Sequence, residues 1–270
     1  MSDTQQMPPA TPHTASSEAL LDLILKRIPA LPELAMRTGR LSTILVESDP
    51  QDTIVALDHL IRRTLAGDET TAVAVLALAT LLIEASVRRH EHAERFYDVV
   101  RDLYQAAAQT EGCQHVAYIL LELPAKRTLL NRRALVQPRF DREVSLGERK
   151  QMAASNNRQN LERLLVDLDP AVVRRVCGNP RISQTDIMRI CTRRPNIPEA
   201  LMEVALSHRW VVRYEIRHAL LRNPYAPTGL GLKFLLLLHR QDLRRVSQAG
   251  DLHPAIAQMA ERILDLRPVA

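Results

Sequence analysis

A helical pattern repeated along the second half of the chain constrains the fold more than any other feature. A basic amphipathic helix, a turn built on Asn or Asp and usually Pro, and another helix occupy residues 173–190 and 216–235, with a weaker copy at 243–264. A short unit of this kind cannot bury its apolar face alone, so neighbouring units must stack. The repetition therefore predicts a stack of small helical units, which presents surface to partners rather than enclosing a reaction.

The composition favours helices along the whole chain. Only 8 of the 270 residues are glycine, whereas Ala, Leu, Arg and Glu are abundant, which is typical of helical proteins. No stretch alternates apolar and polar residues for long enough to predict a strand. Aromatic residues make up only 3% of the chain, so the core must consist of Leu, Ile, Val and Ala. We predict an all-α protein.

Composition and helix signals divide the chain into four segments. Residues 1–15 carry Pro, Ser, Thr and Gln with little to bury, and we expect a disordered tail. Residues 16–124 are expected to form a helical bundle around the stretch 72–87, which is apolar on nearly every side and is therefore predicted to be buried on every side. A basic connector follows at 125–146. The helical repeat domain is expected at 147–270, opened by Ser145 and Glu148 as a capping box.

Charge is distributed unevenly among these segments. Residues 1–125 carry a net charge of −7, whereas residues 126–158 and 159–270 each carry +6, which gives the overall +5. This asymmetry indicates an acidic partner for the second half. Two alternatives remain open: the halves complement each other within one molecule, or the arginines reflect the composition of a GC-rich bacterial genome, since only 4 of the 36 basic residues are lysine.

The turns of the second half align it as helix pairs. In each full unit a first helix, a polar break, a second helix and a closing turn follow one another, and the second helices are predicted at 170–177, 211–221 and 242–248. Two closing turns contain Asn-Pro, in which Asn tolerates the left-handed conformation and Pro prevents the helix from continuing. A truncated unit that begins at Ser183 has no second helix in this alignment.

The residues of these units resemble a known repeat family. The resemblance is carried by the aspartate-rich break at Asp167–Asp169 before Pro170, by Val173-Arg174, by Asn179-Pro180 and Asn223-Pro224, and by Pro198-Glu199. Over about residues 155–264 the chain resembles the leucine-rich repeat variant family and, more broadly, HEAT-like helical repeats. This resemblance implies that the helical bundle is followed by a short HEAT-like α-solenoid of stacked helix pairs. The iron–sulfur association of the family is not expected, because no cysteine cluster precedes the repeats.

Six arginines recur near the same place in successive second helices and are the candidate partner-binding residues. They are Arg174, Arg175, Arg217, Arg222, Arg244 and Arg245. If the helices stack in register, these side chains form a positive band along one side of the repeats. Such a band suits an acidic protein surface, or the phosphates of a nucleic acid with steep salt dependence. The third interpretation is a solvated face that pairs with Glu203, Glu215 and Asp242.

Other candidate chemistry is weak. Neighbours on a helix point about 100° apart, so His90 and His92 are expected to diverge in a solvated turn rather than to hold a metal together. Cys113, Cys177 and Cys191 are irregularly spaced and are predicted to be buried hydrophobic residues in a reducing compartment. Trp210 is predicted to pack at a corner between helices. No cofactor and no metal is expected.

Sequence motifs of catalysis and membrane insertion are lacking. The chain has no Gly-rich phosphate loop, no G-x-S-x-G and no H-E-x-x-H. Its longest uncharged run, residues 70–83, is 14 residues long, shorter than the about 20 that a membrane span needs. No signal peptide is recognised. We therefore expect a soluble, cytoplasmic protein.

These observations predict a non-enzymatic scaffold or adaptor that binds an acidic macromolecular partner, in the first place a protein, through the basic face of its repeats. The alternatives are a nucleic-acid-binding protein that uses the same arginines, and an enzyme with a pocket between the bundle and the repeats.

Overall fold

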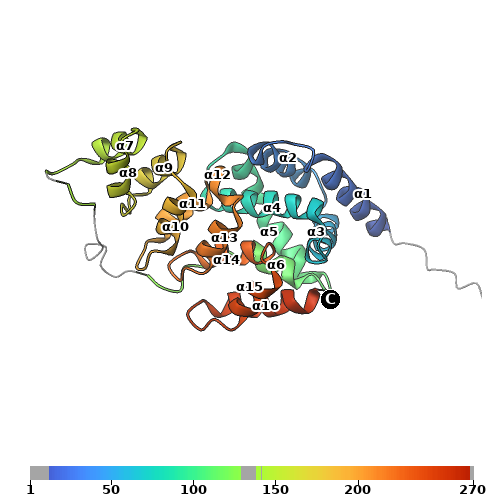
Figure 1. Cartoon of the computed structure of the whole chain (residues 1–270). Helices are drawn as coiled ribbons and strands as arrows, with labels where there is room; N and C mark the ends of the chain where they lie inside the picture. The colour runs from blue at the N-terminus through green and yellow to red at the C-terminus, as the bar shows by residue number, and fades with distance from the viewer. Residues whose placement is uncertain (1–11, 129–137, 141, 268–270) are drawn as a thin grey trace, which may run out of the picture.

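The computed structural model describes residues 12–128, 138–140 and 142–267. These residues form sixteen α-helices and no strand, which confirms the all-α prediction. In Figure 1, α1 lies at one end of the molecule, α7–α9 at the other and α4 near the middle. Most of the predicted tail (1–11) and the middle of the predicted connector (129–137 and 141) fall outside the described residues.

The first half is a bundle of six helices. They are α1 (Pro12–Arg27), α2 (Leu34–Val46), α3 (Pro50–Leu65), α4 (Glu69–Val87), α5 (Glu91–Gln109) and α6 (Gln114–Leu120). Helix α4 packs against α1, α2, α3 and α5, as its apolar circumference predicts. It is the one helix among those described whose length and composition would allow a membrane span, but most of it is buried inside the protein.

Local signals explain where these helices begin and end. The side chain of Asp49 accepts hydrogen bonds from the backbone N–H groups of Gln51 and Asp52, and Pro50 opens α3. Gly67 follows the end of α3 with φ +100°, a conformation that glycine adopts without steric cost. The predicted capping box of Ser145 and Glu148 is present at the start of α7. Residues 12–15, which the sequence assigned to the tail, already belong to α1.

The second half contains ten helices. They are α7 (Leu146–Ala154), α8 (Arg158–Leu164), α9 (Pro170–Gly178), α10 (Gln184–Thr192), α11 (Pro198–Ala205), α12 (His208–Val211), α13 (Tyr214–Leu221), α14 (Thr228–Leu235), α15 (Arg240–Ser247) and α16 (Pro254–Leu266). Helix α15 packs most extensively against α16, and extensive packing also joins α7 to α9, α9 to α11, α10 to α13, α13 to α14, and α14 to α16. Taken in chain order, the helices form three groups, α7–α9, α10–α13 (which includes the short α12) and α14–α16, and the packing of α9 on α11 and of α13 on α14 joins each group to the next.

This grouping differs from the predicted helix pairs. The alignment paired α8 with α9, α11 with α13 and α14 with α15, but α9 packs more extensively against α7 and α11, α13 against α10 and α14, and α15 against α16. Helix α10, which the alignment left as a truncated unit, is the first helix of the middle group. Turn spacing locates helices along the chain, whereas it cannot decide which neighbour a helix packs against.

The two Asn-Pro turns hold equivalent positions in this arrangement. Asn179, after α9, donates through Nδ2 to the carbonyl oxygens of Ala153 and Ser155 at the end of α7, both at 2.8 Å. Asn223, after α13, donates to the carbonyl oxygens of Cys191 (2.7 Å) and Arg193 (3.0 Å) at the end of α10. Each buried amide thus closes the last helix of a group onto the first.

We expect Asn179→Ala and Asn223→Ala each to lower the free energy of unfolding by about 2–3 kcal/mol. Each asparagine also accepts a backbone N–H bond two residues later, and three lost hydrogen bonds at about 1 kcal/mol each set this magnitude. Urea denaturation measures it. Asn157→Ala, which removes an exposed N-cap, is the control, with an expected cost of about 1 kcal/mol. Equal losses at all three positions would show that the two turns are ordinary caps.

The two halves share one hydrophobic core. Buried apolar residues from Leu20 to Ile263 form a single cluster, because α14 and α16 pack against α6. The segment after α6 runs along α14, where the backbone N–H of Gly229 donates to the Leu123 carbonyl at 3.1 Å. Lys233, 1% exposed, donates from Nζ to Glu122 Oε1 at 2.7 Å. The described start of the connector reaches the turn between α15 and α16, where Lys126 donates to the carbonyl oxygens of Gly250 and Leu252.

Candidate functional site

The structure buries one of the six predicted partner-binding arginines. Arg217 is 8% exposed and donates from Nη1 to the Val211 carbonyl at 2.8 Å. The prediction that it faces outward is wrong. Helix α13 is covered by α10, α11 and α14, so positions beside its apolar stripe are covered as well. The apolar residues Val173, Val176 and Ile216 of the same helices are buried.

The other five predicted arginines differ in whether a carboxylate neutralises their charge. Arg174 donates to both oxygens of Glu203, at 2.7 and 3.0 Å. Nη1 of Arg245 lies 3.2 Å from Oδ1 of Asp242, and Nη2 of Arg222 lies 3.9 Å from Oδ1 of Asp251. Arg175 and Arg244 are exposed, and neither forms an ion pair with another described residue. The predicted positive band of arginines is therefore interrupted at the buried Arg217 and partly neutralised by carboxylates.

A group of arginines that lack carboxylate partners surrounds the turn between α9 and α10. Arg209, from α12, donates through Nη1 to the Asn179 carbonyl (2.8 Å) and through Nη2 to the Ile182 carbonyl (3.1 Å), which places it across this turn. Arg181 lies within the turn and is exposed. The two side chains therefore belong to the same small area of surface.

Trp210 connects this turn to two further arginines. Its Nε1 donates to the Cys177 carbonyl at 2.8 Å, which joins α12 to the last turn of α9, where Arg175 is exposed. The backbone N–H of Arg213, also exposed, donates to the Trp210 carbonyl at 2.9 Å. Trp210 itself is 3% exposed, which confirms its predicted corner position. We define the basic turn surface as Arg175, Arg181, Arg209 and Arg213.

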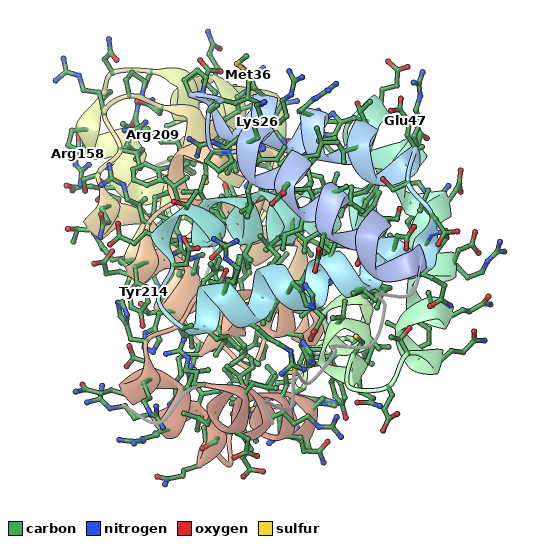
Figure 2. All side chains as sticks on the ribbon, turned by 90° about the vertical axis from the view of Figure 1, so that its right-hand side faces the viewer. Lys26, Met36, Glu47, Arg158, Arg209 and Tyr214 are labelled. Carbon is green, nitrogen blue, oxygen red and sulfur yellow. The ribbon has the colours of Figure 1, made fainter. Side chains whose placement is uncertain are left out.

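Carboxylates near the basic turn surface are engaged elsewhere. Asp186 is buried and accepts from both Nη atoms of Arg158, at 2.6 and 2.7 Å. These bonds from Arg158 hold the pKa of Asp186 below its usual value. Glu215 accepts from Gln184 at 3.2 Å. In Figure 2, Arg158 and Arg209 lie along the same edge of the molecule. No described ion pair neutralises the four arginines of the basic turn surface.

A buried carboxylate with three histidines lies where the bundle meets α12. The side chain of Glu84, in α4, is fully buried, and its oxygens lie 2.6 Å from His208 Nε2, 3.1 Å from His92 Nε2 and 3.7 Å from His90 Nε2. Burial raises the pKa of Glu84, but the hydrogen bonds from His208 and His92 outweigh burial, so the pKa is lowered. Glu84 is therefore ionised and accepts the Nε2–H bonds.

The expected divergence of His90 and His92 is thus wrong. His90 is the N-cap residue of α5, with an extended backbone at φ −122°. The 100° step between neighbours applies only within a helix, so both side chains turn toward Glu84. The sequence does not indicate the third histidine, His208, since it lies in the other half of the chain. Even so, among the described residues no group of His, Cys, Asp or Glu side chains is arranged to hold a metal ion.

A second buried carboxylate lies beside the first. Glu203, in α11, accepts from Arg89 at 2.8 and 3.0 Å as well as from Arg174. Burial raises the pKa of Glu203, and the two arginines lower it further than burial raises it. A cavity of about 450 Å³ opens beside this cluster, with apolar walls that include Pro170, Pro198 and Met202. The net charge of the cluster is small, because each arginine shares the same glutamate.

The three cysteines are buried, as the sequence predicted. Burial raises the pKa of the Cys113 thiol to about 11 and that of Cys177 to about 12, and it raises the pKa of Cys191 as well. Thiols with raised pKa values are poor nucleophiles at neutral pH, because the thiolate is the reactive form. The cysteines thus contribute to packing rather than to chemistry.

Comparison with known protein families, curated proteins and solved structures finds no match for this chain. The resemblance of residues 155–264 to leucine-rich repeat variants and HEAT-like repeats therefore stays a prediction from sequence.

Proposed function

We propose that the protein is a non-enzymatic adaptor whose basic turn surface binds an acidic segment of a protein partner. The observation that supports this most directly is that four exposed arginines lie at or beside one turn, and none of them forms an ion pair with a described carboxylate. Arg209 is held across the turn by two hydrogen bonds to backbone carbonyls, so the surface is preorganised for an acidic segment.

Fixed positive charges on an exposed turn suit recognition by charge complementarity. Such charges steer an oppositely charged partner and determine its orientation, and their effect weakens as salt screens them. Arginine also binds carboxylates through two parallel N–H bonds, which lysine cannot do. The fixed charge and the paired N–H donors of these arginines therefore suit the binding of Asp- or Glu-rich segments.

The burial of Trp210 favours a protein partner over a single-stranded nucleic acid. Proteins that bind single strands stack successive bases on aromatic side chains. Trp210, the aromatic residue at the centre of the basic turn surface, is 3% exposed and covered by the guanidinium of Arg209 at 4.4 Å. It offers no face for a base.

Binding of a labelled polyglutamate peptide, with polyglutamine of the same length as the neutral comparison, tests this proposal. Charge reversal of Arg175, Arg181 and Arg213 to Glu in one variant is expected to weaken polyglutamate binding about thirtyfold, since three rim charges at about 0.7 kcal/mol each sum to about 2 kcal/mol. Arg209 stays unchanged because its hydrogen bonds hold the turn. Fluorescence anisotropy at two salt concentrations gives the affinities.

The matched control reverses Arg27, Arg40 and Arg244, three exposed arginines elsewhere on the protein. It changes the net charge by the same amount and is expected to retain most of the binding. Equal losses of affinity in the two variants would show that binding depends only on net charge and would overturn the proposal. Tighter binding of duplex DNA than of polyglutamate, lost in the first variant alone, would assign the surface to nucleic acid instead.

A further inference from the structure

A second region of the molecule holds arginines that the adaptor does not use. A cavity of about 520 Å³ lies between the turn that joins α3 to α4 and the segments from α13 to α15. Arg217 and Arg267 line it, together with Tyr214 and His239. Its walls are mostly apolar and include Leu65, Ala72, Val73, Leu76, Val212 and Leu236–Leu238.

The two guanidinium groups in this cavity are incompletely satisfied. Arg217 is 8% exposed, and its Nε has no hydrogen-bond partner among the described residues. Arg267 donates from Nη2 to the Leu238 carbonyl at 2.5 Å, but its buried Nε also lacks a described partner. The hydrogen bonds of both side chains reach only backbone carbonyls, and the guanidinium of Arg217 also lies 6.0 Å from the centre of the Tyr214 ring. A buried charge without a counter-ion costs several kcal/mol, so this pair of arginines needs an explanation.

Carboxylates near the cavity do not compensate the two arginines. Asp68 accepts from Arg63 at 2.7 Å and caps α4 through two backbone N–H groups. Glu69 lines the cavity but is exposed to solvent. Asp242 is engaged by the hydroxyl of Tyr214 and by Arg245. No described carboxylate forms an ion pair with Arg217 or Arg267.

Burial lowers the pKa of Arg217 by more than the nearby Tyr214 and Glu215 raise it, and burial together with the nearby charge of Arg240 lowers the pKa of Arg267. The fold thus holds both guanidinium groups in an environment that disfavours their charge. An anion in the cavity would reverse this penalty, because ionised oxygens are the preferred acceptors of a guanidinium.

We propose that this cavity binds a small organic anion, with its carboxylate or phosphate head on Arg217 and Arg267 and its apolar body along Val73, Leu76 and Leu237. The size of the cavity and its mostly apolar walls match the general form of small-molecule sites, in which a few polar groups orient a ligand in an apolar cleft. The Nη–H groups that the bonds to backbone carbonyls leave unused supply the donors, since the Nε atoms have almost no accessible surface.

Calorimetric titration of the full chain with octanoate tests this site, with octyl phosphate and octanol as companions of the same chain length. Octanoate is expected to bind at least tenfold more tightly than octanol, because charge-assisted hydrogen bonds contribute about 1.5–3 kcal/mol. Comparison of octanoate with octyl phosphate identifies the preferred head group. Inorganic phosphate alone is expected to bind weakly, since it makes no use of the apolar walls.

Arg217→Met and Arg267→Met are each expected to weaken octanoate binding about tenfold or more and to leave octanol binding unchanged. Arg222→Met, at the C-cap of the helix that contains Arg217 but outside the cavity, is the matched control and should bind octanoate as the native protein does. Circular dichroism checks that each variant is folded. Where an arginine variant does not fold, Leu76→Trp fills the cavity from the opposite wall and is expected to abolish binding of octanoate.

Three results would overturn the proposal. Octanol could bind the native protein as tightly as octanoate, which would mean that the cavity binds only apolar chains and that the arginines do not contribute. Octanoate could bind all variants equally, which would place the ligand elsewhere, for example beside Arg89 and Arg174. Octanoate and octyl phosphate could both fail to bind the native protein at millimolar concentration. None of these results bears on the basic turn surface, so the two proposals fail separately.

Discussion

Gly229→Ala is expected to lower the free energy of unfolding by about 3 kcal/mol, although alanine is the better helix former by about 1 kcal/mol. A Cβ atom at position 229 would lie 2.8 Å from the carbonyl oxygen of Leu121 and 3.2 Å from Cα of Glu122. Both are backbone atoms of the segment that follows α6, so neither can move without displacing that segment. The substitution would therefore separate the two halves of the molecule where they share a core.

Gly231→Ala, two residues further along α14, is the control. Its Cβ would lie 2.9 Å from Cδ1 of Ile256, the end of a side chain that can rotate away. We expect a change within about 1 kcal/mol, because the gain in helix propensity offsets a small repacking cost. Urea denaturation compares the two variants. A Gly229→Ala protein as stable as the native chain would mean that the contact between α14 and residues 121–122 is loose.

Glu84→Ala is expected to lower the free energy of unfolding at pH 7 by about 3 kcal/mol, since removal of one partner from a buried charged network leaves the others unsatisfied. Glu84 connects α4 to the start of α5 through His92 and to α12 through His208. The exposed Glu94, also close to the start of α5, provides the control, and Glu94→Ala should change stability by less than about 0.5 kcal/mol.

The contribution of Glu84 is also expected to depend on pH. Its pKa in the folded protein lies below the ordinary value of 4.5, so the folded state favours the ionised form. The stabilisation is then complete above about pH 4.5 and is lost as pH falls through the folded pKa. The difference in unfolding free energy between the native protein and Glu84→Gln should therefore shrink as pH falls below about 4.5. A difference that grew as pH fell below about 4.5 would contradict the assigned charge state.

Local features of the sequence predicted local structure well. The predicted capping box at Ser145 is present, and like the N-cap at Asp49 and the glycine after α3 it depends on atoms within a few residues of one another, so the sequence contains the whole interaction. The apolar circumference of α4 likewise predicted its central place, because a helix without a polar face has to be covered on every side.

The candidate sites depended on contacts between distant residues. Arg217 and Arg174 occupy the same place in the repeated pattern, but the first is buried and the second is exposed. Glu203 neutralises Arg174 from a position 29 residues later in the chain, while Arg209 crosses to a turn near Asn179. The only sequence signal for the basic turn surface was the Arg209-Trp210 pair beside a helix break. The sequence did not show which turn these two side chains contact.

The sequence by itself determined that the chain is all helical, where most helices begin and end, and which residues point into the core, because hydrophobic periodicity and capping act over one or two helical turns. Only the tertiary structure decided how the helices group, which arginines keep a free charge, and that three histidines from two halves of the chain meet at Glu84. Those outcomes follow from which surfaces are buried against each other, and burial depends on every helix at once.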